Sequence, residues 1–453
     1  MRTYPQVAAA VAAALGATAA FAAPPSLSTA AAPYLSLYAA GSSAAKPAFT
    51  ASIYSNLCVD PSKTNTLVVT SSPNGNFLAI SCTPPSGTYG SLTLNGSQTV
   101  TIYYRTEGGS VVGALPIASE TAINTLNLND TANISYTAGS NTAVATVNGT
   151  SGTNGVNDSF TGAVVQHVVE YGLTDVEPGA LTGNNYPSAY SSAAYGSATT
   201  AKMGGLTKNK LFQQVFGIFI NTNSSAFTSA FKTSPSLSKE TITNLLQGNI
   251  TDWSKVQDIN GNAVATTLPV IIANREQGSG SRTSADIYFT GDECVASATP
   301  ILEGGALGDS FATGDVLTAA NSNAGAITYA SIDNNGAKAN LQIVNINGIT
   351  PSNLNAATGQ YDFWFEATDV PNTGKYLGVN VLSTNQKNLY KFLESSMQAE
   401  GTAPHVVDIL AIPGVGGNAA SLPVSGTANG SPTIYINPYT RAGVSCNTPS
   451  SAL

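Results

Sequence analysis

Histidine, cysteine and charged side chains are all scarce in this chain of 453 residues. It has two histidines, His167 and His405, and four cysteines, and neither an HExxH pattern nor paired CxxC motifs occur. Because protein zinc sites are built from histidine, cysteine and carboxylate ligands at such spacings, the sequence argues against a His-rich metal centre and a structural zinc site. We expect no metal and no cofactor.

The low charge excludes a second class of function. Only 9% of the residues are charged, and 17 basic against 25 acidic residues give a formal net charge of −8. Nucleic-acid-binding surfaces need clustered lysine and arginine, so nucleic acid is not an expected partner. With 42% hydrophobic residues, the chain has enough length and apolar content for two or three domains with real cores.

Residues 1–22 have the pattern of a cleaved secretory signal peptide. A single charged residue, Arg2, precedes an apolar run from Val7 to Ala20, and Ala20-Phe21-Ala22 fits the small-residue cleavage pattern. No later stretch is apolar over the roughly 18 residues that a membrane-spanning helix needs. We therefore expect the protein to lie in the periplasm or to be secreted, with no membrane span after signal cleavage. We also expect a monomer.

Export makes disulfide bonds the expected state of the four cysteines. Three connectivities can be drawn for them. Cys58 and Cys82 flank one local segment, which favours their pairing and leaves Cys294 for Cys446. The alternative is that one or more of these cysteines stays free.

Strand-like and helix-like runs alternate along the chain, which predicts an α/β protein with mainly parallel sheets. Strands are expected at 34–38 and 268–272, and short strands and turns dominate from about 50 to 165. Ser238 is a good N-cap and Gly248 a good helix end, so a helix is expected between them. The apolar stripes that predict this helix and a second one are Ile242, Leu245 and Leu246, and Leu389, Phe392, Leu393 and Met397.

The segment from Asn274 to Thr283 is the richest in chemistry. It reads Asn-Arg-Glu-Gln-Gly-Ser-Gly-Ser-Arg-Thr and lies between an apolar strand and a segment, 285–289, that can begin a helix. Unpaired N–H groups at a helix start attract anions, and small residues let an oxyanion approach closely. Arg275 could add the planar pair of donors that phosphate and carboxylate groups accept. The alternative is a solvent-facing Gly/Ser turn.

Three further segments have related features, although each is weak alone. Residues 40–45, Ala-Gly-Ser-Ser-Ala-Ala, form a strand-to-helix turn that can offer N–H groups and the Ser43 hydroxyl to an anion. Residues 104–110, Tyr-Arg-Thr-Glu-Gly-Gly-Ser, make another small-residue corner after a strand. Asp175 follows an apolar run, where an aspartate before a proline is also a common turn residue.

In this order, the four segments resemble the periplasmic phosphate-binding protein of phosphate ABC transporters and its wider family. The loop 275–281 resembles the family's R-x-D-G-S-G-T, and 171–178 resembles its FGASDAP. Residues 104–113 and 40–43 resemble its Y…GSSGG and AGA-T segments, while 325–329 resembles its GAIGY strand. The resemblance spans about 34 to 400. Two departures are Gln277, where the family has an aspartate that pairs with the arginine, and Ala44, where it has an aromatic residue.

The resemblance implies a two-lobed class II periplasmic-binding-protein fold of α/β class. Lobe 1 would comprise 33–215 and 361–453, with β-rich insertions at roughly 50–100 and 115–165, and lobe 2 would comprise 216–360. It implies a non-enzyme that captures inorganic phosphate or a similar oxyanion between the lobes and either passes it to an ABC permease or retains it outside the cell. Carried over by position, the ligand-binding residues are Ser43, Ala44, Ser110, Asp175, Arg275, Ser279, Gly280 and Ser281.

Two other functions compete with this interpretation. The first is a secreted surface or matrix protein that uses the same fold without transport, which the low charge and the β-rich segment favour. The second is a secreted phosphatase, which is disfavoured because a GxSxG elbow, a P-loop lysine and a metal cluster are all missing from the sequence. We expect His167 to be a packing residue rather than a general base.

Overall fold

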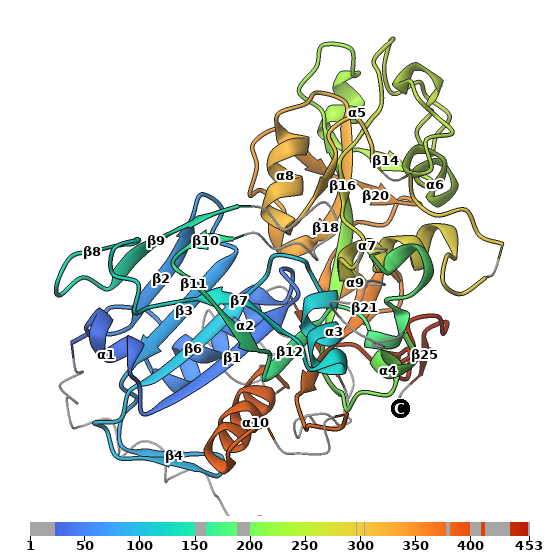
Figure 1. The fold of residues 1–453 in the computed structure, drawn as a ribbon. Coiled ribbons are helices and arrows are strands. Elements are labelled where there is room, and N and C mark those ends of the chain that lie inside the picture. The colour runs from blue at the N-terminus through green and yellow to red at the C-terminus, as the bar shows by residue number, and fades with distance from the viewer. Residues whose placement is uncertain are drawn as a thin grey trace, which may run out of the picture.

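The computed structural model describes residues 23–149, 160–187, 200–295, 297–302, 304–376, 381–398, 409–412 and 435–451. Figure 1 shows two lobes, one at lower left and one at upper right, joined by strands that run between them. A single network of paired strands extends through both lobes in the order β10-β9-β2-β3-β6-β1-β12-β21-β13-β18-β15. The predicted α/β class is confirmed.

Lobe 1 contains the blue and cyan part of the sheet in Figure 1. Its sheet strands are β1 (Leu35–Gly41), β2 (Leu67–Ser72), β3 (Phe77–Cys82), β6 (Val100–Arg105), β8 (Ile134–Tyr136), β9 (Thr142–Asn148), β10 (Thr161–Gly162) and β12 (Tyr171–Thr174). Two small pairs are β4 (Gly87–Tyr89) with β5 (Leu92–Leu94), and β7 (Ala122–Leu126) with β11 (Val164–Val168). Its helices are α1 (Leu27–Ala31), α2 (Lys46–Ser52), α3 (Val111–Ser119), α4 (Thr200–Gly204) and α10 (Thr384–Gln398).

Lobe 2 is smaller and is built on β18 (Ala326–Ser331). Its other strands are β14 (Ser236–Leu237), β15 (Ile271–Ile272), β16 (Asn274–Arg275), β17 (Asp309–Ser310), β19 (Leu341–Ile343) and β20 (Asn345–Ile346). Its helices are α5 (Ser229–Thr233), α6 (Lys239–Leu246), α7 (Gly280–Ala285) and α8 (Thr313–Asn321). The remaining elements are α9 (Asn353–Ala357), β22 (Ile409–Ala411), β23 (Tyr435–Ile436), β24 (Tyr439–Thr440) and β25 (Ser450–Ser451).

Two long strands run between the lobes. The first part of β13 (Asn209–Asn221) pairs with β21 (Trp364–Pro371), which in turn pairs with β12 of lobe 1. The second part of β13 pairs with β18 of lobe 2. The residue boundaries expected for the lobes stay a prediction. The expected signal peptide, 1–22, lies outside the described residues, as does much of the C-terminal part of expected lobe 1.

The expectation of mainly parallel sheets is wrong, because the sheet is mixed. β1 pairs parallel with β6 and β12. The β2–β3 hairpin, however, is antiparallel and joins β6 antiparallel, and the pairs β12–β21, β21–β13 and β13–β18 are antiparallel too. A short hairpin connection allows only antiparallel pairing. The strands β13 and β21 pass between the lobes in opposite directions, which accounts for the other antiparallel pairs.

The helix predictions are confirmed where the apolar period is clear. The Ser238 hydroxyl caps α6 by accepting from the N–H of Thr241 at 3.0 Å, and Gly248, just beyond the helix, has φ +74°. The predicted stripe of α6 is fully buried, as is most of the predicted stripe of α10. Within the described residues, no helix combines the length and apolarity needed to cross a membrane.

The structure contains both favoured disulfides, Cys58–Cys82 and Cys294–Cys446. The first lies within lobe 1 and joins the end of the helical segment after α2 to the end of β3. The second joins the loop after α7 and its π-helical extension, Asp286–Thr290, to the C-terminal segment. The predicted pairing is confirmed.

Candidate functional site

Close backbone contacts bring three turns of lobe 1 together at the ends of β1 and β12. A Cβ atom on Gly41 would lie 1.9 Å from the carbonyl oxygen of Leu173, and one on Gly113 of α3 would lie 2.6 Å from the same oxygen. Only glycine permits such an approach. Ser110, which precedes α3, thereby meets Asp175, which follows β12, and its hydroxyl accepts a hydrogen bond from the Asp175 N–H at 3.0 Å.

Asp175 places a buried carboxylate between the lobes. The Ser42 hydroxyl of lobe 1 donates to its Oδ1, and the Ser281 hydroxyl of lobe 2 donates to its Oδ2 at 3.5 Å. Burial raises the pKa of Asp175 to about 6, although the Ser42 hydrogen bond and the positive charge of Arg275 lower it. The carboxylate is therefore an acceptor that takes up a proton just below neutral pH.

The Gly/Ser loop of lobe 2 begins α7 at Gly280, five residues before the segment expected to start the helix. Ser279 is the N-cap, and its hydroxyl accepts from the N–H of Arg282 at 3.4 Å. The Arg282 side chain is buried, with its Nη1 donating to the carbonyl of Arg275 at 3.2 Å and its Nε 3.6 Å from the Asp286 carboxylate. These contacts make Arg282 a structural support of the loop.

The start of α7 touches lobe 1 directly. The carbonyl of Gly278 accepts from the N–H of Val111, the first residue of α3, at 2.9 Å. A Cβ atom on Gly280 would lie 2.3 Å from the Ser110 hydroxyl oxygen and 2.7 Å from Cβ of Asp175. The two lobes are therefore closed on each other at the candidate site.

Arg275 is the cation of the site and is only 1% exposed. Its Nε and Nη2 donate to the carbonyls of Ser310 and Phe311, each at 3.1 Å. Its Nη1 donates to the hydroxyls of Thr313 at 3.1 Å and Ser43 at 3.4 Å. Ser43 belongs to lobe 1, so this guanidinium also bridges the lobes. Burial lowers its pKa, although nearby negative charges raise it.

The structure thus brings most of the predicted site residues into mutual contact. Those that touch across the lobes are Ser43, Ser110, Asp175, Arg275, Gly280 and Ser281. The hydroxyl of Ser279 is used for capping. Ala44 is buried, and its carbonyl accepts from Gln214 at 2.8 Å. The ligand-binding role of each residue stays a prediction.

Sequence reasoning missed Ser42 and Thr313. Ser42 is adjacent to Ser43 in one small-residue turn, and the sequence did not distinguish which hydroxyl faces Asp175. Thr313 begins α8 shortly after β17, which is the same strand-to-helix pattern that marked the other turns. That pattern could have identified it. His167 packs its ring on Tyr38, with ring centroids 3.4 Å apart, as expected for a packing residue.

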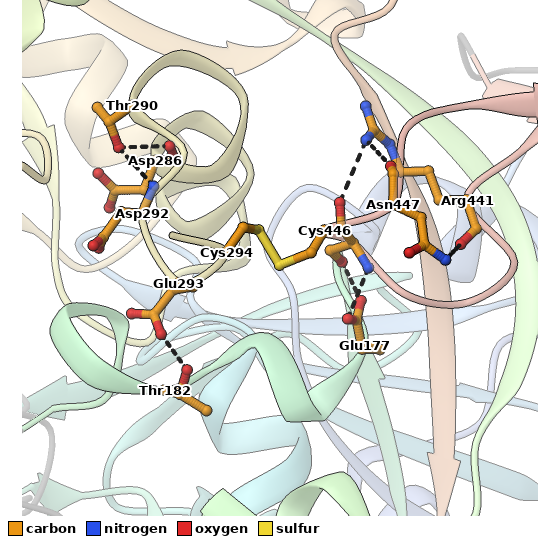
Figure 2. The surroundings of a disulfide bond; sticks show 11 residues. Glu177, Thr182, Asp286, Thr290, Asp292, Glu293, Cys294, Arg441, Cys446 and Asn447 are labelled. Atoms are coloured by element: carbon orange, nitrogen blue, oxygen red, sulfur yellow. Dashed lines mark hydrogen bonds between the residues drawn. A yellow bond between two sulfur atoms is a disulfide. The ribbon is translucent and has the colours of Figure 1, made fainter. Parts of the chain in front are cut away.

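Figure 2 shows how the segment after Asp175 is held in place. The Glu177 carboxylate accepts hydrogen bonds from both the N–H and the hydroxyl of the serine that precedes Cys446. Cys446 is bonded to Cys294 of the loop beyond α7, and the neighbouring Glu293 accepts from the hydroxyl of Thr182. The chain that follows Asp175 is thus tied to lobe 2 twice, directly and through the C-terminal segment.

No protein-family model matches the chain, and no curated protein matches it. Its structure is similar to that of a protein from Clostridium perfringens assigned as a phosphate ABC transporter substrate-binding protein, with bound phosphate. That match has a TM-score of 0.42 and 15% identity, over 81% of this chain and 97% of the other.

Two other solved structures are similar over a smaller part of the chain. An ABC-type phosphate transport receptor from Vibrio cholerae has a TM-score of 0.30 and 16% identity, over 56% of this chain and 82% of that one. A phosphate-binding protein from Stenotrophomonas maltophilia has a TM-score of 0.33 and 14% identity, over 58% of this chain and 80% of that one. At these values the similarity assigns no ligand to this chain.

Proposed function

We propose that the protein is an exported solute-binding protein that captures inorganic phosphate, or a similar tetrahedral oxyanion, between its two lobes. The observation that carries this proposal is one contact region in which a buried guanidinium, a buried carboxylate and hydroxyls from both lobes converge. Charge-assisted donors around an anion are the usual means by which proteins bind phosphate. The resemblance of the four sequence segments to phosphate-binding proteins supports the same function.

Asp175 would give the site its selectivity. A buried carboxylate repels a fully ionised anion, but it can accept a hydrogen bond from an anion that keeps a proton. Phosphate carries such a proton at neutral pH and sulfate does not. We therefore expect the site to prefer phosphate and arsenate to sulfate.

Binding would require the lobes to part and close again. In the structure, Arg275 meets Ser43, and Ser281 meets Asp175, by direct hydrogen bonds across the interface. An entering ion would take the place of these contacts, and the lobes would close on it about the strands β13 and β21. No covalent bond of the ligand is made or broken in this scheme. The lobes would later reopen and release the ion, which an ABC permease would then take up.

An anion screen with matched arginine variants tests this function. Calorimetric titration would compare phosphate, arsenate, sulfate and methylphosphonate on the wild type, Arg275→Ala and Arg441→Ala. Arg441 is also a buried arginine, packed on Phe365 with its guanidinium carbon 4.4 Å from the ring centroid, so it controls for the loss of a buried cation. We expect Arg275→Ala to lose about 100-fold or more in phosphate affinity, since several charge-assisted hydrogen bonds disappear, and Arg441→Ala to keep it.

Thermal denaturation would verify that each variant is folded. Absence of binding to every anion by the wild type would refute the proposal and favour the surface or matrix role. Equal phosphate affinity of Arg275→Ala and the wild type would refute the site.

A further inference from the structure

Thr313 is a buried hydroxyl residue that contacts the donors of both lobes. It is the first residue of α8 and is 5% exposed. Its N–H donates to the Ser43 hydroxyl oxygen at 3.2 Å, and the two hydroxyl oxygens are 2.8 Å apart. Its hydroxyl oxygen also accepts from Nη1 of Arg275 at 3.1 Å. One side chain of lobe 2 therefore holds a hydroxyl of lobe 1 and the guanidinium at the same time.

These contacts fix the direction in which Ser43 uses its hydroxyl. A serine oxygen has two lone pairs and one proton. The Thr313 N–H and Nη1 of Arg275 both donate to the oxygen of Ser43, at 3.2 and 3.4 Å. With both lone pairs engaged, Ser43 is the donor of the 2.8 Å contact, and its proton points to the Thr313 hydroxyl oxygen. An entering oxyanion could accept this proton in place of Thr313, because the oxygens of an oxyanion are mainly acceptors.

Thr313 also takes part in orienting the guanidinium of Arg275. The hydrogen bonds of this group to the described residues go to the carbonyls of Ser310 and Phe311 and to the hydroxyls of Thr313 and Ser43. All four acceptors are uncharged. They hold the guanidinium in one orientation by hydrogen bonds to neutral groups, although the negative charges of Glu276 and Asp175 also act on it.

We infer that Thr313 is a positioning residue of the proposed oxyanion site, whose hydroxyl oxygen accepts from both Ser43 and Nη1 of Arg275 and so holds these two donors side by side. This inference depends on the proposed function, because its effect is measured on phosphate affinity. The inference adds to the predicted ligand-binding residues, none of which lies on α8.

Three substitutions on α8 test the inference. Thr313→Val removes the hydroxyl at nearly constant volume, Thr313→Ser keeps it, and Thr318→Val removes an outward hydroxyl that bonds only within the helix, to the Gly314 carbonyl at 2.7 Å. We expect Thr313→Val to weaken phosphate binding about tenfold, as for the loss of one hydrogen bond. Thr313→Ser and Thr318→Val should stay within about twofold of the wild type. If Thr313→Val does not fold, Thr313→Ala replaces it.

A double-mutant cycle separates positioning from a general structural effect. If the Thr313 hydroxyl holds Ser43 as well as Arg275, then Thr313→Val should cost clearly less in a Ser43→Ala background than in the wild type, because only its contact with Arg275 is left to lose. If the losses of phosphate affinity caused by Thr313→Val and by Ser43→Ala simply multiply in the double variant, the inference is overturned. Equal phosphate affinity of Thr313→Val and Thr318→Val would overturn it too. A wild type that binds no oxyanion would instead be a failure of the proposed function, so the two failures are distinguishable.

Discussion

At Gly280 the two lobes meet with no space for a side chain. A Cβ atom there would lie 2.3 Å from the Ser110 hydroxyl oxygen and 2.7 Å from Cβ of Asp175, and no side-chain rotation can move Cβ of Asp175 away. The residue has no left-handed φ, so space rather than backbone conformation requires glycine. Even alanine at position 280 would therefore prevent the two lobes from approaching as closely as they do in this structure.

We predict that Gly280→Ala weakens phosphate binding by at least about tenfold, because the added methyl group keeps the start of α7 away from Ser110 and Asp175. The free energy of unfolding should change by less than about 1 kcal/mol, since the lobes can part slightly to accept the methyl group. Calorimetric titration and urea denaturation measure the two quantities. Gly314→Ala is the control, since a Cβ atom on Gly314 would meet nothing within 4 Å. Unchanged affinity of Gly280→Ala would contradict this account.

A residue of the candidate site could be identified from the sequence where a reactive side chain lies in a recognisable motif. Which of two neighbouring side chains points into the site could not be predicted in this way. Arg275 stands out because it lies in a Gly/Ser loop after a strand, and Asp175 because its segment resembles a segment of the phosphate-binding family. The distinction between Ser42 and Ser43 depends on the backbone of Gly41, which has φ +131°. The contact of Thr313 with Ser43 joins residues 270 positions apart, which local patterns do not reveal.

Among the elements, β21 connects the lobes and carries a buried carboxyl group, Asp369, that joins three strands. Its oxygens accept from the hydroxyl of Tyr171 in β12 at 2.8 Å and from the N–H and side-chain amide of Asn209 in β13 at 3.1 and 3.0 Å. Burial and, to a smaller extent, the negative charge of Glu394 raise the pKa of Asp369 to about 8. The folded state therefore favours the protonated acid.

We predict that Asp369→Asn makes the stability of the protein less dependent on pH. In the unfolded chain an aspartate loses its proton near pH 4, whereas the folded state keeps this one until about pH 8. The stabilisation is thus present below about pH 4 and is lost as the pH rises through 8. Between pH 5 and pH 8 the wild type should lose about 3–4 kcal/mol more than the variant, measured by urea denaturation without phosphate. Parallel pH profiles for the two proteins would show that Asp369 does not titrate in this way.

The elements themselves could be predicted in part. The helices α6 and α10 have apolar stripes of helical period, and these are visible in the sequence. The direction of pairing could not be read in the same way, because β21 pairs with strands that precede it by some 150 residues or more. The strand expected at 268–272 contains Pro269, and the structure keeps only Ile271–Ile272 as β15.

On the scale of the whole molecule, the two disulfides differ in how much chain they close. Cys58–Cys82 spans 24 residues within lobe 1, and Cys294–Cys446 spans 152 residues and joins lobe 2 to the C-terminal segment. A crosslink stabilises the fold chiefly by restricting the unfolded chain, and more so for a longer loop.

We predict that replacing Cys294 and Cys446 by alanine lowers the free energy of unfolding by about 1–2 kcal/mol more than replacing Cys58 and Cys82. The longer closed loop accounts for the sign of the difference. Urea denaturation of the two double variants at equal protein concentration provides the comparison, and the wild type with both disulfides intact serves as the reference. An equal or larger loss for the Cys58 and Cys82 variant would contradict the loop-length argument.

The late position of β21 and Cys446 has a consequence for how the protein is made. A chain that is threaded N-terminus first delivers β12 and β13 well before the strand that lies between them, and it delivers Cys294 well before its partner. Until then an apolar strand edge and a reactive thiol are exposed together. The second disulfide and the central strand pairing can therefore form only after the last part of the chain has been made.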